Sequence, residues 1–586
     1  MIEAKKLSKI LFIDLSKKSY WIEDRPELFE KYLGGSGVGI QLLKEFCPDG
    51  IDPLDEKNPI IFTVGYLNAI YPLASKLVAM FKSPLTGNLG ESHCGGRSAV
   101  SFRMAGYGAL VILGKCDLPI FLVINEKSVE FRNANTLWGM QDLFTVGKII
   151  REQVPKPGSR TIMRIGKAGE KLIPYASVTT ETYRHFGRLG LGAVFGSKML
   201  KAIVITGNET FTLADKKGYY NTYNSLYQIL TGDQVMKKYH DIGTPINVMA
   251  LNGIKGLPTK NASSGEFEHA EKLSGEHIAQ NYLGRRTACS HCPVACIHIA
   301  TLREPYENDP YFYRTKFVSY DHEPIFALGS MLGIETTEGF LKIMDTAEIY
   351  GLDCMSLGGA LAWATEAYQK GIITDKETGG LQLKFGDVNT YVKAIDAVVS
   401  QKIPFFKDLS MGAEYASQKW GGREFAMCFG KNEMAGYQTG PIAFLGYLVG
   451  SRHSHLDGAG YSFDQKYLGK PMDMKKAAEY LFEEEAWRNV LSSAVLCFFA
   501  RNVYTPEKFS ECLKNIGIDK SPDQLKALGR EILREKYKFK VKQGFTLDPN
   551  KIRIPERIFE VQTSNGIIKK EDFISALTHF IGLIEK

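Results

Sequence analysis

The feature that most constrains this chain is a run of three cysteines, Cys289, Cys292 and Cys296, spaced as C-x2-C-x3-C. This spacing holds three sulfurs close enough to bind one inorganic centre, provided that a fourth ligand comes from elsewhere. Runs of this kind typically ligate an iron–sulfur cluster and less often a structural zinc ion. The alternative is a set of three buried or disulfide-paired thiols. If the run binds a centre, the fold has to bring a distant ligand to it.

Length and charge limit the kinds of protein that this chain can be. Its 586 residues exceed what one hydrophobic core supports, so we expect two to four domains. The net charge of +7 is spread along the chain rather than gathered in blocks. A dedicated nucleic-acid binder would cluster its basic residues, so we expect no nucleic-acid partner. A modest positive charge instead favours docking of a small acidic protein.

The N-terminus and the cysteines together indicate a cellular compartment. The first ten residues lead into a four-residue apolar run, which is too short for the apolar region of a signal peptide. No stretch approaches the ~18 apolar residues of a membrane span. Apart from the run at 289–296, the cysteines stand singly. We therefore expect a protein without a membrane span in the reducing cytoplasm.

Residues 1–210 are predicted to be rich in β-strands. Leu11–Asp14 and Tyr20–Ile22 flank a polar turn, and Ile120–Ile124 and Val129–Arg132 flank another, which predicts two hairpins. Further apolar runs alternate with turns that contain Gly or Pro. Strands this frequent indicate packed sheets rather than one dinucleotide-binding unit.

Two glycine clusters interrupt these strands, at Gly34–Gly39 and Gly187–Gly192. Both miss the G-x-G-x-x-G spacing, so neither supports NAD binding. Glycine also lets main-chain N–H groups approach a phosphate or a ring closely. From the residues alone, each cluster is either a structural turn or a ligand-binding loop.

From residue 211 onward, apolar residues recur at three- and four-residue steps, which predicts helices. The expected helical segments are 218–230, 337–350, 358–370, 474–499 and 522–538. We therefore expect an α+β fold with a β-rich base domain at 1–210, a helical domain at 211–420 and a second helical domain at 421–586. The middle domain would hold the cysteine run.

Cys497 is our choice for the fourth ligand of the cysteine run. It ends a helix-like stretch and is followed by Phe498 and Phe499, whose rings would shield a cluster from water. On these grounds alone the other single cysteines compete with it.

Several longer motifs resemble those of a known family. They are Lys82-Ser-Pro-Leu-Thr-Gly-Asn, Cys94-Gly-Gly, the stretch from Ala105 to Lys115, and the stretch from Gly187 to Ile203. Together with the cysteine run and Tyr350-Gly-Leu-Asp353, they resemble, in the same order, the tungsten-containing aldehyde:ferredoxin oxidoreductase family. The resemblance covers most of the chain and is least clear after about residue 515.

The resemblance implies a set of cofactors and a fold. Members of the family carry tungsten, or occasionally molybdenum, held by the dithiolenes of two pterins beside one [4Fe–4S] cluster. Their base domain is a saddle of two sheets under the pterins, with two mainly helical domains above it. The family's cluster ligands match Cys289, Cys292, Cys296 and Cys497, so the cluster is expected to join the second domain to the third.

The resemblance also implies two catalytic residues. Glu323 matches the family's active-site glutamate, and burial in an apolar pocket would raise its pKa so that it accepts a proton near neutral pH. His455 matches the active-site histidine and would donate a hydrogen bond to the aldehyde oxygen or a metal oxo ligand. His453 is the alternative, because the alignment needs a one-residue gap there.

Two stretches match the family's D-x-x-G-L-C/D pterin motifs. The first runs from Glu348 to Asp353, with Glu in place of the leading Asp, so its carboxylates are retained for the donor groups of a pterin. The second runs from Ser492 to Cys497; Leu496 fits the motif, but the leading Asp and the Gly are missing.

The base domain supplies the other cofactor residues that the resemblance implies. Lys76 replaces an arginine between pterin and cluster, and His93 replaces an asparagine near a Mg²⁺ that bridges the pterin phosphates. Backbone and guanidinium groups would offset the charge of those phosphates. The remaining expected cofactor residues are Gly95, Gly96, Arg184, His185, Gly187 and Arg188.

Assembly is expected to differ from that of some relatives. Some members form homodimers through a metal bound by a glutamate and a histidine of each subunit, and the matching positions here are Lys342 and Val392. We therefore expect no metal-bridged homodimer, and instead a ferredoxin or a small multi-cluster ferredoxin-like subunit as partner.

The predicted function is tungsten-dependent oxidation of an aldehyde to a carboxylic acid, with electrons passed through the cluster to the ferredoxin partner. The alternative enzyme runs in reverse and reduces an acid or an aromatic acyl thioester, as the tungsten subunit of benzoyl-CoA reductase does. A third hypothesis is a non-catalytic cluster or zinc scaffold, which would need the cysteines but neither Glu323 nor His455.

Overall fold

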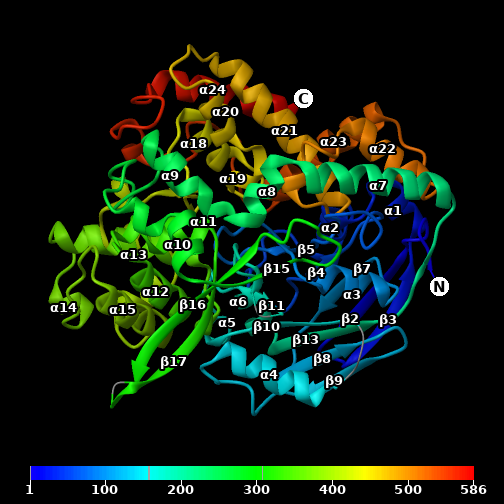
Figure 1. The fold of residues 1–586 in the computed structure, drawn as a ribbon, viewed down its shortest axis with the longest axis horizontal. Coiled ribbons are helices and arrows are strands. Elements are labelled where there is room, and N and C mark those ends of the chain that lie inside the picture. The colour runs from blue at the N-terminus through cyan, green and yellow to red at the C-terminus, as the bar shows by residue number, and fades with distance from the viewer. Residues whose placement is uncertain (1, 156–158, 182, 307) are drawn as a thin grey trace.

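The computed structural model describes residues 2–155, 159–181, 183–306 and 308–586. Its N-terminal part contains two six-stranded sheets, and the rest is mostly helical, so the predicted α+β fold class is confirmed (Figure 1). The helical part lies over one side of the sheets in this view. The proposed domain boundaries near 210 and 420 stay predictions.

The first sheet has the strand order β3-β2-β7-β4-β5-β6. Its strands are β2 (Lys9–Asp14), β3 (Ser19–Asp24), β4 (Ile60–Thr63), β5 (Leu77–Lys82), β6 (Leu89–Cys94) and β7 (Ala109–Leu113). Strands β4 and β5 are buried along their whole length, which explains their continuous apolar sequence. The antiparallel β2–β3 pair confirms the first predicted hairpin.

The second sheet has the order β12-β11-β10-β13-β8-β9. Its strands are β8 (Ile120–Ile124), β9 (Val129–Asn133), β10 (Ser159–Ile165), β11 (Val178–Thr180), β12 (Arg184–Phe186) and β13 (Leu200–Gly207). The antiparallel β8–β9 pair confirms the second predicted hairpin. Short helices accompany the sheets: α1 (Pro26–Tyr32), α2 (Gly35–Phe46), α3 (Ser98–Met104), α4 (Leu143–Gln153), α5 (Lys167–Glu170) and α6 (Leu191–Ser197).

The first glycine cluster serves packing. Helix α2 begins at Gly35, and a Cβ there would lie only 2.0 Å from the Ser492 carbonyl oxygen. At Gly34, where φ is 110°, a Cβ would lie 2.2 Å from the Val64 oxygen. Glycine is therefore needed for the close approach of three backbone segments.

Helices dominate the chain after residue 211. The predicted segments correspond to α7 (Lys216–Gly232), α12 (Thr337–Tyr350), α13 (Cys354–Gln369), α21 (Met474–Ser493) and α23 (Pro522–Lys542). The prediction at 474–499 was six residues too long, because Val495 has a φ of 56° and turns the chain out of the helix.

The other helices complete the C-terminal part. They are α8 (Gln234–Asp241), α9 (Asn247–Gly253), α10 (Gly275–Asn281), α11 (His322–Leu328), α14 (Asp375–Thr378), α15 (Val388–Ser400), α16 (Pro404–Leu409), α17 (Ala413–Trp420), α18 (Pro441–Val449), α19 (His455–Gly458), α20 (Gly460–Lys466), α22 (Pro506–Asn515) and α24 (Lys570–Glu585). No helix in the described part of the chain is both long and apolar enough to span a membrane. The cytoplasmic location stays a prediction.

A third sheet was not expected from the sequence. Its strands β15 (Leu283–Thr287), β16 (Ile297–Tyr306) and β17 (Asp309–Tyr320) form an antiparallel sheet in which β16 is central. The far ends of β16 and β17 project from the body of the molecule, at the lower left of Figure 1.

The C-terminal part contributes to the core of the base. One large apolar core joins residues of β2, β4 and β5 to Val490, Leu496 and Ile532. The end of α21 and the loop after it are therefore packed onto the N-terminal sheets, although they are far away in sequence.

Candidate active site

Two adjoining cavities, of about 320 and 200 Å³, lie where the N-terminal, middle and C-terminal parts of the chain meet. Both are lined by Lys76, His93, Arg184, Arg188 and Glu323. The larger one also contains the predicted residues Gly187, Cys289, Cys292, Cys296, His455, Leu496 and Cys497. The smaller one also contains Gly95, His185, Gly187, Glu348 and Asp353. Gly96 and Ser492 line neither cavity, so nearly all predicted site residues are brought together.

Backbone hydrogen bonds bring Cys497 to the cysteine run. The Cys497 N–H donates to the Leu73 oxygen at 2.9 Å, and the Leu73 N–H donates to the His291 oxygen at 2.9 Å. The Lys76 N–H donates to the Val495 oxygen at 3.0 Å on the other side of the same contact. The segment at 73–76 therefore lies between the two cysteine segments and holds both.

Gly96 has a role in this arrangement although it does not line a cavity. Its oxygen accepts a bond of 2.9 Å from the Ser290 N–H, within the cysteine run. At Gly95, an added Cβ would lie 2.7 Å from Cys289 Sγ and 3.3 Å from Lys76 Nζ. Glycine is thus required at 95 because the cysteine run passes close to it, and it is favoured at 96 because φ there is 93°.

The charges around the thiols are complementary to thiolates. Burial lowers the pKa of Lys76, but nearby Cys497 and Cys289 outweigh it and raise the pKa overall. Burial also lowers the pKa of Arg184, but the nearby cysteines, Cys289 above all, raise it overall. Burial raises the pKa of Cys292 to about 12 when no metal is present. Binding of a cationic centre would favour its thiolate form.

No group of three or more His, Cys, Asp or Glu within residues 2–155, 159–181, 183–306 and 308–586 is arranged to hold a metal ion. The ligand role of the four cysteines therefore stays a prediction. It is supported by their spacing, their common cavity and the backbone bonds that join their segments.

Glu323 and His455 form a pair at the wall of the larger cavity. The distance from His455 Nε2 to Glu323 Oε1 is 3.1 Å, and the Tyr437 hydroxyl donates to the same oxygen at 3.4 Å. Burial raises the pKa of Glu323, but the hydrogen bond and charge of His455 lower it by more. Our expectation of a raised pKa for Glu323 was wrong, because the sequence does not show that His455 is its partner.

Asp321 has the raised pKa that was expected of Glu323. Burial is the main cause, the Glu323 carboxylate adds to it, and Arg184 partly opposes it. Asp321 lines both cavities, and no donor within the described residues reaches its Oδ1. Sequence reasoning missed this residue, although its place two residues before Glu323 was a signal.

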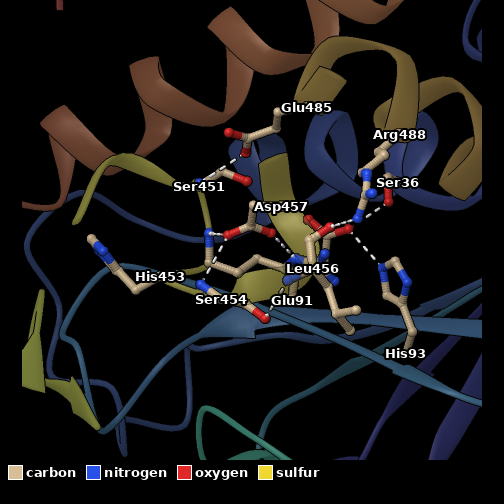
Figure 2. A network of polar contacts seen from close by, with 12 residues as sticks. Ser36, Glu91, His93, Ser451, His453, Ser454, Leu456, Asp457, Glu485 and Arg488 are labelled. Carbon is tan, nitrogen blue, oxygen red and sulfur yellow. Dashed lines mark hydrogen bonds and ion pairs between the residues drawn. The ribbon is translucent and has the colours of Figure 1, made fainter. Parts of the chain in front are cut away.

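A network of polar contacts positions the loop that carries His455 (Figure 2). Asp457 Oδ2 accepts from the N–H groups of Arg452 and Ser454 at 3.0 and 3.1 Å. Glu485 accepts from the Ser451 N–H at 2.9 Å, and Arg488 donates to the Leu456 oxygen at 2.8 Å. These bonds hold the loop before the short helix α19 and the helix itself, on which His455 is the first residue.

The geometry favours His455 over His453. His453 Nδ1 lies 3.1 Å from the Tyr447 oxygen, and its Nε2 lies 3.1 Å from Lys540 Nζ. It has no place in the lining of either cavity. His453 therefore has a structural role, whereas His455 faces the cavity.

The first pterin motif contacts the loop beside the predicted phosphate site. His185 Nε2 lies 2.9 Å from Glu348 Oε2, and Arg188 Nε donates to Asp353 Oδ2 at 3.2 Å. Asp353 also caps α13 through the Met355 N–H. The two carboxylates are thus already partly satisfied, so their role in pterin binding stays a prediction.

His93 is held by Glu91 at the opposite wall. The distance from His93 Nε2 to Glu91 Oε1 is 2.7 Å, and the Ser36 hydroxyl donates to the same oxygen at 2.5 Å (Figure 2). Burial lowers the pKa of His93 to about 4, so its imidazole is neutral. Its position near a Mg²⁺ stays a prediction.

Several buried polar atoms in the cavity walls lack a protein partner. Among the described residues none bonds to Arg184 Nε, Arg188 NH1, Asp321 Oδ1 or His455 Nδ1. Leaving such groups unpaired costs about 1–3 kcal/mol each, so a ligand is expected to satisfy them. Two guanidinium groups and Lys76 on the same walls fit an anionic cofactor with hydrogen-bonding groups.

Comparison with known proteins identifies the family. The family model of the aldehyde ferredoxin oxidoreductase N-terminal domain matches residues 10–207, and the model of its domains 2 and 3 matches residues 222–580. The chain belongs to the aldehyde ferredoxin oxidoreductase family. The scaffold hypothesis is thereby excluded, because the family consists of oxidoreductases.

Two relatives show how similar the chain is to other proteins. The chain is 31% identical over 581 residues to the tungsten-containing aldehyde ferredoxin oxidoreductase of Pyrococcus horikoshii, covering 95% of this chain and 92% of the relative. It is 28% identical over 411 residues to the WOR-like subunit of the aliphatic sulfonate oxidoreductase of Pyrococcus furiosus, covering 67% and 64% of the two chains.

A solved structure shares the fold of the whole chain. The active-site complex BamBC of benzoyl coenzyme A reductase, in complex with 1,5-dienoyl-CoA, superimposes with a TM-score of 0.81 at 20% identity. The match covers 99% of this chain and 98% of that chain. Proteins that share this fold therefore act on different substrates.

Proposed function

We propose that this member of the family oxidises an aldehyde to a carboxylic acid with a tungsten–bispterin cofactor. In the balanced reaction, RCHO and water give RCOOH, two protons and two electrons. The observation that carries the proposal is the Glu323–His455 pair, buried in a cavity that is also lined by four cysteines and several cations. The tungsten-containing relatives, 31% identical in one case, support the choice of metal.

The residues of the two cavities divide the work of holding the cofactors. Arg184 and Arg188 would offset the charge of the pterin phosphates, and Glu348 and Asp353 would accept from pterin donors. Tungsten held by pterin dithiolenes supplies two-electron redox chemistry when bound. Cys289, Cys292, Cys296 and Cys497 would hold one [4Fe–4S] cluster. We also propose that a Mg²⁺ binds near His93.

His455 and Glu323 would handle the proton of the reaction. His455 Nε2 lies 3.1 Å from Glu323 Oε1, and its Nδ1 has no partner within the part of the chain that the structure describes. In this proposal, His455 donates a hydrogen bond to the aldehyde oxygen and stabilises developing negative charge. The Glu323 carboxylate, whose pKa His455 lowers, holds the imidazole ring in place, and the pair takes up the released proton by way of that ring.

The electrons would leave through the cluster to a ferredoxin or a ferredoxin-like subunit. A metal-bridged homodimer is not part of the proposal, because Lys342 Nζ pairs with Glu304 Oε1 at 3.5 Å and Val392 packs against the helical core. The WOR-like relative is itself named as a subunit, which agrees with a heteromeric assembly.

Metal analysis and an activity screen test the proposal. We expect tungsten with about four irons per chain, and reduction of a viologen dye by short, long or aromatic aldehydes. Glu323→Gln is the matched variant, in which activity falls while metal content is kept. Zinc without tungsten would contradict the proposal. A tungsten-loaded protein that oxidises no aldehyde but reduces an acid or an aromatic acyl thioester would contradict it in favour of the reductase.

A further inference from the structure

The unexpected third sheet begins at the cysteine run. Strand β15 ends at Thr287, two residues before Cys289, and β16 begins one residue after Cys296. The sheet then extends outward as the β16–β17 hairpin, which projects from the body (Figure 1). Strand β17 is an edge strand of twelve residues. Long exposed edges are liable to pair with other chains unless a partner covers them.

One face of this hairpin is held by the body of the protein. Lys316 Nζ lies 2.5 Å from Asp345 Oδ2 on α12, and Lys342 of α12 pairs with Glu304. Leu302 and Val318 on the same face are 3% and 2% exposed. The hairpin is therefore anchored on α12 by alternate residues of its strands.

The opposite face is aromatic and exposed over its outer part, beyond the buried pair Ile299 and Ser319. Paired residues point to the same side of a sheet, and the register pairs Thr301 with Phe317 and Pro305 with Tyr313. Phe317 and Tyr313 are 53% and 52% exposed, and Tyr311, which lies within the register shift near the tip of the hairpin, is 90% exposed. Aromatic side chains gathered on a surface in this way mark an interaction site.

Two arginines lie on this same face. Arg285 pairs with Ile299, and Arg303 pairs with Thr315, so both point to the side of Phe317 and Tyr313. The Arg303 guanidinium carbon lies 4.9 Å from the centre of the Tyr313 ring. No ion pair joins either arginine to a carboxylate within the described ranges, in contrast to Lys316 and Lys342 on the other face. The aromatic face thus carries unpaired positive charge.

We propose that this face, defined by Arg285, Arg303, Tyr313 and Phe317 and called the arm face, docks a small acidic iron–sulfur protein next to the cysteine run. This inference rests on the proposed function, in which electrons leave through that run. The unpaired arginines favour an acidic partner, and the aromatic rings supply apolar contact area. Docking here places the partner on the sheet that leads directly to Cys289 and Cys296.

A second copy of the chain is a poorer occupant. Pairing two arm faces would bring Arg285 and Arg303 of one copy against the same arginines of the other. Like charges brought together in an interface oppose association. The charge pattern therefore favours a different, acidic partner.

The experiment measures binding and activity with separate probes. The binding probe is a purified small acidic ferredoxin with two [4Fe–4S] clusters, titrated by calorimetry at low and high salt. The activity probes are that ferredoxin and benzyl viologen, a small dye that needs no docking site. The test variants are the charge reversal Arg285→Glu with Arg303→Glu, and the aromatic removal Tyr313→Ser with Phe317→Ser.

The control changes charge equally on a distant surface. Lys514→Glu with Lys526→Glu alters exposed residues of α22 and α23, at the upper right of Figure 1 and far from the arm. We expect the charge reversal to weaken ferredoxin binding and to raise the KM for ferredoxin by about tenfold at low salt. The aromatic removal should weaken binding at both salt concentrations, and neither should change viologen reduction.

The results separate the two proposals. Equal ferredoxin binding by the arm variants and the control would overturn the docking site, whatever the activity. A homodimer in sedimentation that the arm variants dissociate would also overturn it, in favour of a second copy. If aldehydes fail to reduce viologen, the proposed function fails, while the calorimetric comparison still decides the docking site.

Discussion

One added methyl group at Gly95 tests whether Cys289 is a cluster ligand. A Cβ there would lie 2.7 Å from Cys289 Sγ, and ordinary contact begins at 3.4 Å. The sulfur therefore has to move by about 0.7 Å, whereas metal–ligand distances tolerate about 0.2 Å. We expect Gly95→Ala to detach Cys289 from the cluster. Overpacking of this kind costs about 1–3 kcal/mol, which leaves the chain folded.

The assay is iron and acid-labile sulfide per chain after anaerobic purification, together with the EPR spectrum of the reduced protein. We expect about four irons in the unsubstituted protein and about three or fewer in Gly95→Ala. Gly253→Ala is the matched control, because a Cβ at the end of α9 meets nothing within 4 Å. Four irons and an unchanged spectrum in Gly95→Ala would refute the placement of Cys289 at the cluster.

Three further predictions follow from the site and the core. Glu323→Gln and His455→Gln should each lower kcat by about 10²–10⁴-fold, because both remove a proton-handling group; normal kcat with full tungsten content would contradict this. Cys497→Ser should lose iron, whereas Cys116→Ser, which can keep its bond to a backbone oxygen, should not; iron analysis decides. Asp464 is fully buried, and burial raises its pKa to about 7. The folded state therefore binds its proton more tightly than the unfolded state, and stability is lost as the pH rises through about 7. The free energy of unfolding falls by up to about 4 kcal/mol for this reason. Asp464→Asn should flatten this decline in urea unfolding between pH 4 and 8, and parallel curves for the two proteins would contradict it.

The sequence predicted those parts of the fold that depend on local patterns. The hairpins at β2–β3 and β8–β9 were found because short apolar strands flank a polar turn. The third sheet was missed, because the expectation of a helical region outweighed the alternation in Ile297–Arg303. Exposed aromatic residues also lack the apolar–polar alternation of a half-buried strand.

The candidate site was predicted as a set of residues, but not as a set of interactions. Motif order identified Glu323 and His455. The lowering of the Glu323 pKa by His455, however, depends on a contact between α11 and α19. Asp321 was missed for the same reason, since its raised pKa comes from burial and from the Glu323 charge. Single-sequence patterns carry no information on such contacts between distant segments.

The bonds that join residues 73–76, 290–291 and 495–497 have a consequence for how the protein is made. Cys497 leaves the ribosome 208 residues after Cys289, so the nascent chain first offers an incomplete set of three thiols. The fourth arrives only when α21 has packed onto the N-terminal sheets. If these cysteines bind the proposed cluster, iron delivery has to wait for the nearly complete chain, and the cluster would link segments that are synthesised far apart.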